Sequence, residues 1–490
     1  MSELGFEDVD PSLVAGRATR GVLFLILRYA GIRVFALVAN IVLSRVLSPE
    51  AFGIYAITLF LLVLLTFVGD FGLGASLLQQ RKRVSDIDLR TAFTAQQVLV
   101  GALLLVLFML APLFATIYHL GPQGVWFVRV MLIAGLLTSL KTAPTIVLER
   151  QLRYGQLAIV EIMDFGLFQL AAVALALAGF GAWSFVLAVL LSKSASMLLA
   201  YALAGWVPHL GLNVERFQAL WRFGLPFQLS WLTYYLRDYM IPILGGLLVT
   251  TAQVGYLNWA LALTGVPGQL AQIVGRVTLP ALARFQDQPT ALARAVEQSV
   301  RGLVITALPM HLAIVALAPW LIHLVFSDKW QPALPALYLL SVHWSGANLT
   351  SPLVSALNAM GRVRMALLLN ATWTAATIVL ALGFLNVLGF TGIALAYSLS
   401  MIGASAAAVL SVRRYLNIRL WQQVRFPILA ATLAWGSCFL ARQALAPTLI
   451  NLVLLIIASG AAYLAILWLG EGPRIRLELE TVLHRPLGAR

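Results

Sequence analysis

Charged side chains are scarce in this chain. Asp, Glu, Lys and Arg make up 11% of its 490 residues, whereas soluble globular domains carry roughly 25%. Hydrophobic residues make up 61%, and the mean hydropathy is +0.91. Because so few polar groups cannot cover a folded core in water, we expect lipid to be the main solvent of this chain. An ordinary soluble domain is thereby excluded.

Acidic residues are even scarcer than basic ones, with 19 Asp and Glu against 33 Lys and Arg and a net charge of +14. A basic balance of this size is also typical of nucleic-acid-binding proteins. Here, however, the basic residues form short clusters between apolar runs and do not form a stripe interleaved with aromatic residues. We therefore expect membrane lipids, and no nucleic acid, among the partners.

Cysteine and catalytic motifs are nearly absent. Cys438 is the single cysteine, which excludes a disulfide framework or a cysteine-based metal site within one chain. No H-E-x-x-H, P-loop or G-x-S-x-G motif occurs, and the longest polar stretch between apolar runs is about twenty residues. We expect neither an enzyme nor a bound cofactor. Without a P-loop, energy must come from an ion gradient, the membrane potential or a partner.

Long apolar runs fill the rest of the sequence. A helix needs about 20 mainly apolar residues to cross the hydrocarbon of a bilayer, and fourteen segments qualify. They lie near residues 21–45, 52–77, 92–117, 125–148, 157–179, 182–205, 220–247, 252–280, 301–326, 333–358, 365–387, 389–412, 426–446 and 449–469. The sequence predicts an all-α integral membrane protein with a short segment at 1–20, six-helix bundles at 21–215 and 216–425, two further helices at 426–469 and a tail at 470–490.

The basic residues between these segments predict the orientation. If residue 1 lies in the cytoplasm, the cytoplasmic segments hold 23 of the Lys and Arg residues and the opposite segments hold four, Arg45, Arg129, Lys329 and Arg442. Basic residues are retained on the cytoplasmic side of membranes. We therefore expect a multi-pass protein with both termini in the cytoplasm.

Ten charged residues fall inside the predicted spans, where each costs several kcal/mol unless it is paired or faces water. The candidates for a cationic, substrate-binding cavity are Arg28, Arg33, Lys141, Lys193, Arg237 and Arg276. The candidates for ion coupling or gating are Asp70, Glu161, Asp164 and Asp238. The interior thus carries a cationic surplus, and the planar guanidinium group matches pyrophosphate and carboxylate oxygens.

Equal spacing around two turns predicts ion pairs. Arg28 and Asp70 each lie 21 residues from Pro49, and Lys141 and Asp164 lie at nearly equal distances from Leu152. At a rise of about 1.5 Å per residue, the members of each pair reach the same depth. For Asp70, pairing with Arg28 and gating is favoured over a coupling-ion site, which stays open.

For charged residues close together on one predicted helix, the angle between the side chains decides whether they share a face. Glu161 and Asp164 are three residues apart and share a helix face. Arg237 and Asp238 point about 100° apart and need not neutralise one another.

The two halves of the chain carry a faint repeat. Phe52-Gly53 opens the second span, and Val254-Gly255 opens the eighth, an offset near 202 residues. Because both halves begin on the same side, this predicts a parallel repeat about an axis along the membrane normal.

Several sequence blocks resemble the Wzx-type polysaccharide flippases. They are L-S-P-E-A-F-G-I-Y-A (47–56), F-V-G-D-F-G-L-G-A-S-L-L-Q (67–79), E-R-Q-L-R-Y-G-Q-L-A (149–158), L-A-G-F-G-A-W (177–183), R-F-G-L-P-F-Q (222–228), V-G-Y-L-N-W-A (254–260) and G-R-V-T-L-P-A-L-A-R-F-Q (275–286). The resemblance implies a member of the superfamily that also holds the MATE exporters and lipid II flippases. It also implies two pseudo-symmetric six-helix bundles around a central cavity, plus two C-terminal helices.

The same resemblance implies a function. The substrate would be an undecaprenyl-pyrophosphate-linked oligosaccharide repeat unit, turned across the bacterial inner membrane for O-antigen (lipopolysaccharide), capsule or exopolysaccharide assembly. Alternating access would be driven by a gradient of H⁺ or Na⁺, beside a polysaccharide polymerase and other assembly proteins. Two alternatives stay open: a MATE-like ion-coupled antiporter of small molecules and a non-transporting membrane enzyme of glycan assembly.

Overall fold

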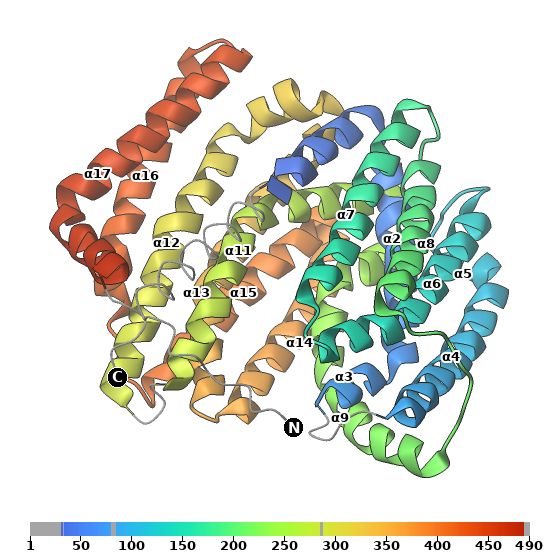
Figure 1. Cartoon of the computed structure of the whole chain (residues 1–490). Helices are drawn as coiled ribbons and strands as arrows, with labels where there is room; N and C mark the ends of the chain where they lie inside the picture. Colours follow the sequence, from blue (N-terminus) through green and yellow to red (C-terminus); the bar gives the residue numbers. More distant parts are fainter. Residues whose placement is uncertain (1–30, 33, 80–84, 285–287, 485–490) are drawn as a thin grey trace.

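The computed structural model describes residues 31–32, 34–79, 85–284 and 288–484, and these residues form helices and short connections without strands. The first half holds a short apolar helix, Val34–Val46, and seven labelled helices (Figure 1). Their bounds are α2 Pro49–Asp70, α3 Leu73–Gln79, α4 Asp86–Met109, α5 Ala111–Ile117, α6 Gly124–Arg150, α7 Tyr154–Leu177 and α8 Trp183–Ala204.

The second half is longer and contains two π-helical turns and one 3₁₀ turn. Its elements are α9 Val214–Asp238, η1 Ile241–Gly245, α10 Gly246–Leu248, α11 Thr251–Arg284, α12 Pro289–Trp320, η2 Leu321–Phe326, η3 Asp328–Ala333, α13 Leu334–Ala359, α14 Val363–Leu388, α15 Phe390–Arg413, α16 Leu420–Ala444 and α17 Leu449–His484. In the described residues, 10 helices are long and apolar enough to cross a membrane. The predicted all-α membrane fold is confirmed.

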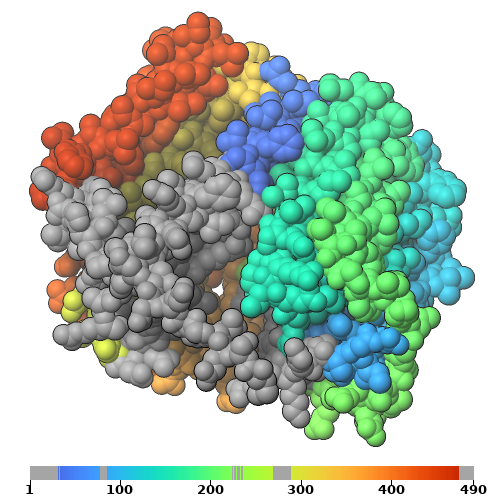
Figure 2. Space-filling view, in the orientation of Figure 1, coloured from blue at the N-terminus to red at the C-terminus, as the bar shows by residue number. Residues whose placement is uncertain are grey.

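Each half packs mainly against itself. In the first half α6 contacts α2, α4 and α8, and α7 lies along α8. In the second half α13 contacts α11, α12 and α15, while α16 joins α12 to α17. Figure 2 shows α7 and α8 on one side of the molecule and α16 and α17 on the other. The two sets of helices meet through few elements, chiefly α2 with α11 and α9 with α3 and α4.

The first contact between the halves lies where α2 and α11 begin, called the Pro49 end below. A Cβ on Gly53 would lie 1.8 Å from the carbonyl oxygen of Thr251, and a Cβ on Gly255 would lie 1.9 Å from that of Pro49. The 202-residue offset of the predicted repeat relates Gly53 to Gly255 and Pro49 to Thr251, so it converts each of these contacts into the other. The repeated glycines therefore let the two corresponding helices touch backbone to backbone.

Aromatic side chains fill the space beside this contact. The rings of Trp259 and Trp330 stack with centroids 4.7 Å apart, and Phe52 meets Trp330 edge-on at 5.0 Å. Ser44 joins both indoles: its hydroxyl accepts from Trp259 Nε1 at 3.2 Å and its carbonyl from Trp330 Nε1 at 2.9 Å. Trp259, Trp330 and Ser44 are almost completely buried. The halves are thus closed at the Pro49 end.

Exposed hydrogen bonds extend the contact between the halves to the surface. Arg45 donates from Nε to the carbonyl of Val325 at 2.7 Å, and Lys329 donates to the carbonyl of Arg45 at 2.8 Å. Nearby, His323 Nδ1 lies 2.9 Å from Asp328 Oδ1, and this hydrogen bond lowers the pKa of the Asp328 carboxyl.

The second contact is made by α9, beside α3 and α4 at the bottom of Figure 1. A Cβ on Gly72 would lie 2.2 Å from the carbonyl oxygen of Gly224, so here too glycines allow a close approach. At its far end α9 contacts α14, and the Tyr397 hydroxyl on α15 donates to the carbonyl of Arg237 at 3.2 Å. One helix therefore bridges both sets.

The last helix is fixed by a buried ion pair. Arg301 on α12 donates through Nη2 to Glu471 on α17, with 2% and 12% of the two side chains exposed. The Tyr463 hydroxyl adds a bond to the carbonyl of Ile305 at 2.8 Å. α17 continues past the predicted span end at 469 to His484, and the pair fixes it at Glu471 just beyond that end.

We expect Arg301→Ala to weaken the docking of α17 by about 3–5 kcal/mol, because it leaves a buried carboxylate without its cation. The readout is the thermal unfolding of the purified chain and protease cleavage of its C-terminal segment. Arg425→Ala, at an exposed position on α16, is the matched control. The double variant Arg301→Met/Glu471→Met should be more stable than Arg301→Ala; equal loss in both would contradict the ion-pair argument.

Candidate functional site

Three charged residues from three helices meet in the first half. Lys141 on α6 and Lys193 on α8 both place Nζ 2.8 Å from the same oxygen, Oδ2, of Asp164 on α7. Lys141 also donates to the Ser196 hydroxyl at 3.2 Å. We call Lys141, Asp164 and Lys193 the Asp164 cluster. The predicted Lys141–Asp164 pair is confirmed, whereas the sequence did not identify Lys193 as a second partner.

The cluster is deep and only partly accessible. Lys141 lies nine residues from the end of α6 and Asp164 ten from the start of α7, which places both about 14–15 Å from the helix ends. Their side chains are 15% and 16% exposed, and that of Lys193 is 25% exposed. Two ammonium groups share one carboxylate, so one positive charge is uncompensated within the cluster, and an anion that reaches it would supply the missing charge.

The other oxygen of Asp164 is buried without a hydrogen-bond partner in the described part of the chain. Glu161, one turn before it on α7, is exposed and forms no ion pair with another described residue. Glu161 and Asp164 lie one turn apart on α7, and of the two only Asp164 holds cations.

Arg237 and Asp238 lie at the end of α9. Arg237 Nη2 lies 2.8 Å from Asp238 Oδ1, so the neighbours do pair. The angular spacing left the pairing open, and it forms where Asp238 is the last residue of α9, so that the Arg237 side chain can lie along the helix end. The guanidinium also lies over the ring of Trp373 on α14, 4.8 Å from its centre. The attraction between the guanidinium and the ring face fixes the Arg237 side chain against α14.

Asp70 lies at a break between two helices. α2 ends at Asp70, Phe71 and Gly72 adopt positive φ angles of 45° and 71°, and α3 begins at Leu73. The amide of Gly74 donates to Asp70 Oδ1 at 3.3 Å, and Gln96 Nε2 donates to the same oxygen at 3.4 Å. The break was not predicted, because the apolar run continues through it.

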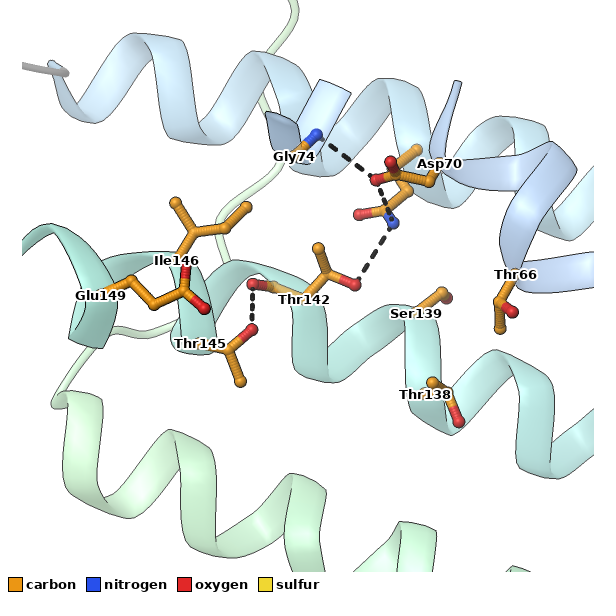
Figure 3. Close-up of a pocket in the computed structure, with 10 residues that line it drawn as sticks. Thr66, Asp70, Gly74, Thr138, Ser139, Thr142, Thr145, Ile146 and Glu149 are labelled. Atoms are coloured by element: carbon orange, nitrogen blue, oxygen red, sulfur yellow. Dashed lines mark hydrogen bonds between the residues drawn. The ribbon is translucent and has the colours of Figure 1, made fainter. Parts of the chain in front are cut away.

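A polar cavity of about 260 Å³ opens beside Asp70 between α2, α4 and α6 (Figure 3). Gln96 connects the helices, since its Nε2 also donates to the Thr142 hydroxyl at 3.4 Å. The lining residues are Thr66, Asp70, Gly74, Gln96, Thr138, Ser139, Thr142, Thr145, Ile146 and Glu149. Of these, only Asp70 stood out in the sequence, because single hydroxyls and amides in apolar runs carry no pattern.

The side chains of three of the six predicted cationic residues lie outside the part of the chain that the structure describes. Arg28 and Arg33 fall outside the described residues, and so does the side chain of Arg276. The Arg28–Asp70 pair therefore stays a prediction.

Taken together, the helices and buried charges define a multi-pass membrane protein built from two helix sets, with ionic sites among the helices of the first set. The fold matches the lipid II flippase MurJ in its inward closed conformation, with a TM-score of 0.79 over 93% of this chain and 100% of that one. It also matches an inward-facing MATE-family multidrug resistance transporter of the MOP superfamily, with a TM-score of 0.63 over 78% of this chain and 94% of that one. Identities of 12% and 17% show a shared fold alone.

The chain belongs to the polysaccharide biosynthesis protein family, whose model matches residues 42–335. It is 25% identical over 338 residues to the succinoglycan biosynthesis transport protein ExoT of Rhizobium meliloti, covering 68% of this chain and 67% of that protein. It is 22% identical over 346 residues to the lipopolysaccharide biosynthesis protein WzxC of Escherichia coli, covering 68% of both. The resemblance drawn from the sequence blocks is confirmed.

Proposed function

We propose that this protein translocates lipid-linked oligosaccharide repeat units across the bacterial inner membrane for the assembly of O-antigen, capsule or exopolysaccharide. Its relatives ExoT and WzxC are named for succinoglycan transport and lipopolysaccharide biosynthesis. The substrate is an undecaprenyl-pyrophosphate carrier loaded with a short glycan. On this proposal the protein is a transporter and not an enzyme.

The observation that carries the proposal is the surplus of positive charge in the Asp164 cluster. Two ammonium groups bound to one carboxylate oxygen, deep in a helix bundle, are a costly arrangement unless an anion offsets them. A pyrophosphate or an acidic sugar supplies that anion. A carrier of cationic drugs would need the opposite sign.

Arg237 supplies a second cationic contact, on α9 in the bridge between the halves. Its guanidinium is stacked on Trp373 and paired with Asp238, and a guanidinium is the group that suits a pyrophosphate or carboxylate. The proposed cationic lining also includes three residues assigned to it because they lie inside predicted spans: Arg28, Arg33 and Arg276.

The transport cycle follows from the two contacts between the halves. With both termini in the cytoplasm, the closed Pro49 end faces the periplasm. Opening there while α9 stays against α3 and α4 would expose the substrate to the outer leaflet, with a gradient of H⁺ or Na⁺ as the driving force. The division into bundles at 21–215 and 216–425, the helices at 426–469 and the tail at 470–490 is part of this proposal.

Deleting the gene tests the function directly. We expect loss of surface polysaccharide and accumulation of the lipid-linked repeat unit on the cytoplasmic leaflet, with unchanged sensitivity to cationic drugs. Complementation by the wild-type gene should restore export. Drug hypersensitivity with normal polysaccharide would instead favour the MATE-like antiporter and would overturn the proposal.

A further inference from the structure

We propose that the cavity between α2, α4 and α6 binds a hard monovalent cation, for which Na⁺ is the probe. The binding itself follows from the geometry of the cavity. Only the use of the ion to drive transport rests on the proposed function.

The charge of the site comes from Asp70. No basic side chain among the described residues pairs with it, and its carboxylate accepts from neutral donors, the amides of Gly74 and Gly72 and the side chain of Gln96. Gln96 is 5% exposed, so the polar groups are held by packing and not by solvent. A carboxylate fixed in this way beside an internal cavity attracts a cation.

Three hydroxyl groups of the cavity lining, those of Thr66, Thr138 and Thr145, offer lone pairs and no hydrogens. Thr138 donates to the carbonyl of Ala134 at 2.9 Å, and Thr145 donates to that of Thr142 at 2.7 Å. Thr66 donates in the same way to the carbonyl of Val63 at 3.0 Å. Because each hydroxyl has one hydrogen, already directed at its own helix, the oxygens can only accept. Such a lining favours a cation and disfavours an anion.

The kind of cation follows from the donor set. Carboxylate, hydroxyl, amide and water oxygens suit hard cations, whereas transition metals need His or Cys ligands. In the described part of the chain, no group of three or more His, Cys, Asp and Glu residues is placed to hold a metal ion. The second carboxylate of the lining, Glu149, lies two helical turns beyond Thr142, toward the other end of the row of lining residues in Figure 3. One close carboxylate matches a single positive charge.

The site lies beside the contact between the α2–α3 break and α9, so binding of a cation there can affect how the two halves are joined. The break at Phe71 and Gly72 contacts Gly224 on α9, and Gln228 of α9 donates to the carbonyl of Phe67 just before Asp70. A cation bound at Asp70 would fix the break between α2 and α3, and with it the start of the bridge helix. Broken helices serve as ion sites in transporters for this reason.

The test measures ²²Na⁺ binding to the purified full chain in nanodiscs, without any lipid-linked substrate. We expect saturable binding that unlabelled NaCl displaces and choline chloride does not. Asp70→Asn and Thr142→Val should each weaken the affinity about tenfold or more, since each removes an oxygen group or its orientation. Asp86→Asn, an exposed carboxylate on α4, and Thr372→Val, an exposed hydroxyl on α14, are the matched controls.

Absence of saturable Na⁺ binding in the wild-type chain would overturn the proposal, and so would unchanged binding in both cavity variants. If Asp70→Asn does not fold, Thr142→Val decides, because it keeps the shape of the side chain. Since binding is measured apart from transport, a chain that binds Na⁺ but leaves polysaccharide export intact when deleted would refute the proposed function and not this site.

Discussion

Gly255→Ala is expected to block polysaccharide export, because one methyl group cannot be accommodated where α2 and α11 touch. The added Cβ would lie 1.9 Å from the carbonyl oxygen of Pro49, and a Cβ on Gly53 would lie 1.8 Å from that of Thr251. Both obstacles are backbone atoms of helices, which cannot rotate away as a side chain can. Overpacking costs about 1–3 kcal/mol, and near the upper end of that range the closed conformation loses about 100-fold of its population.

Two measurements follow from this argument. Export is measured in a deletion strain that expresses Gly53→Ala or Gly255→Ala, and both variants should fall together. Closure is measured with Ser44→Cys in a Cys438→Ser background, where a thiol reagent that cannot cross the membrane should react faster once either glycine is replaced. Position 44 is fully buried in the closed form.

The chain offers a matched control for the glycine variants. Gly101 lies within α4, and a Cβ there would meet nothing within 4 Å. Gly101→Ala should therefore export normally and leave Ser44→Cys protected, with a slight gain in helix stability. Normal export by both Gly53→Ala and Gly255→Ala would contradict the view that this backbone contact is an obligatory step.

Reversing the charge of Lys193 should abolish export as well. A glutamate at position 193 would face Asp164, whose Oδ2 now lies 2.8 Å from the lysine Nζ. Two carboxylates would repel one another and the anionic substrate, and each uncompensated charge at this depth costs several kcal/mol. We expect export to fall by about 100-fold or more, since 1.4 kcal/mol is a factor of ten.

Conservative changes separate charge from packing. Lys193→Arg keeps the cation and should retain much of the export, whereas Lys193→Met keeps the apolar stem and should lose most of it. Arg294→Glu reverses a charge at an exposed position on α12 and should export normally. Export is compared at equal amounts of protein in the membrane. If Lys193→Glu and Lys141→Glu both export at the wild-type rate, the cationic site is not used.

Part of the candidate site was predictable from spacing. A helix rises by a fixed amount per residue, so equal distances from Leu152 set Lys141 and Asp164 at one depth, and the structure places them in contact. Spacing around the turn between α7 and α8 also sets Lys193 at a depth close to that of Asp164, but it does not say that both lysines reach the same carboxylate. The depth of a residue depends only on its position along its own helix. Whether two residues touch also depends on which helices are neighbours and on which side of the helix each lies.

The Asp70 cavity shows the same limit more strongly. Its carboxylate is conspicuous in an apolar run, but Gln96 and Thr142 are ordinary residues of other spans until packing brings them to it. The break after Asp70 was also invisible, because Phe71 is an apolar residue that continues the hydrophobic pattern. Phe71 has a φ of 45°, and the neighbouring Gly72 lies against Gly224 of α9, a contact between segments far apart in the sequence.

The sequence by itself determined that this protein lies in a membrane, is built of helices and belongs with polysaccharide transport proteins, because hydrophobic length and sequence blocks are local properties. Only the tertiary structure decided that Gly53 and Gly255 form one symmetric contact, that two lysines share Asp164, and that Asp70 opens onto a cavity. The physical reason is that the rotation of each helix about its axis is set by the helices packed around it. That rotation decides which side chains meet, and therefore what the buried charges can bind.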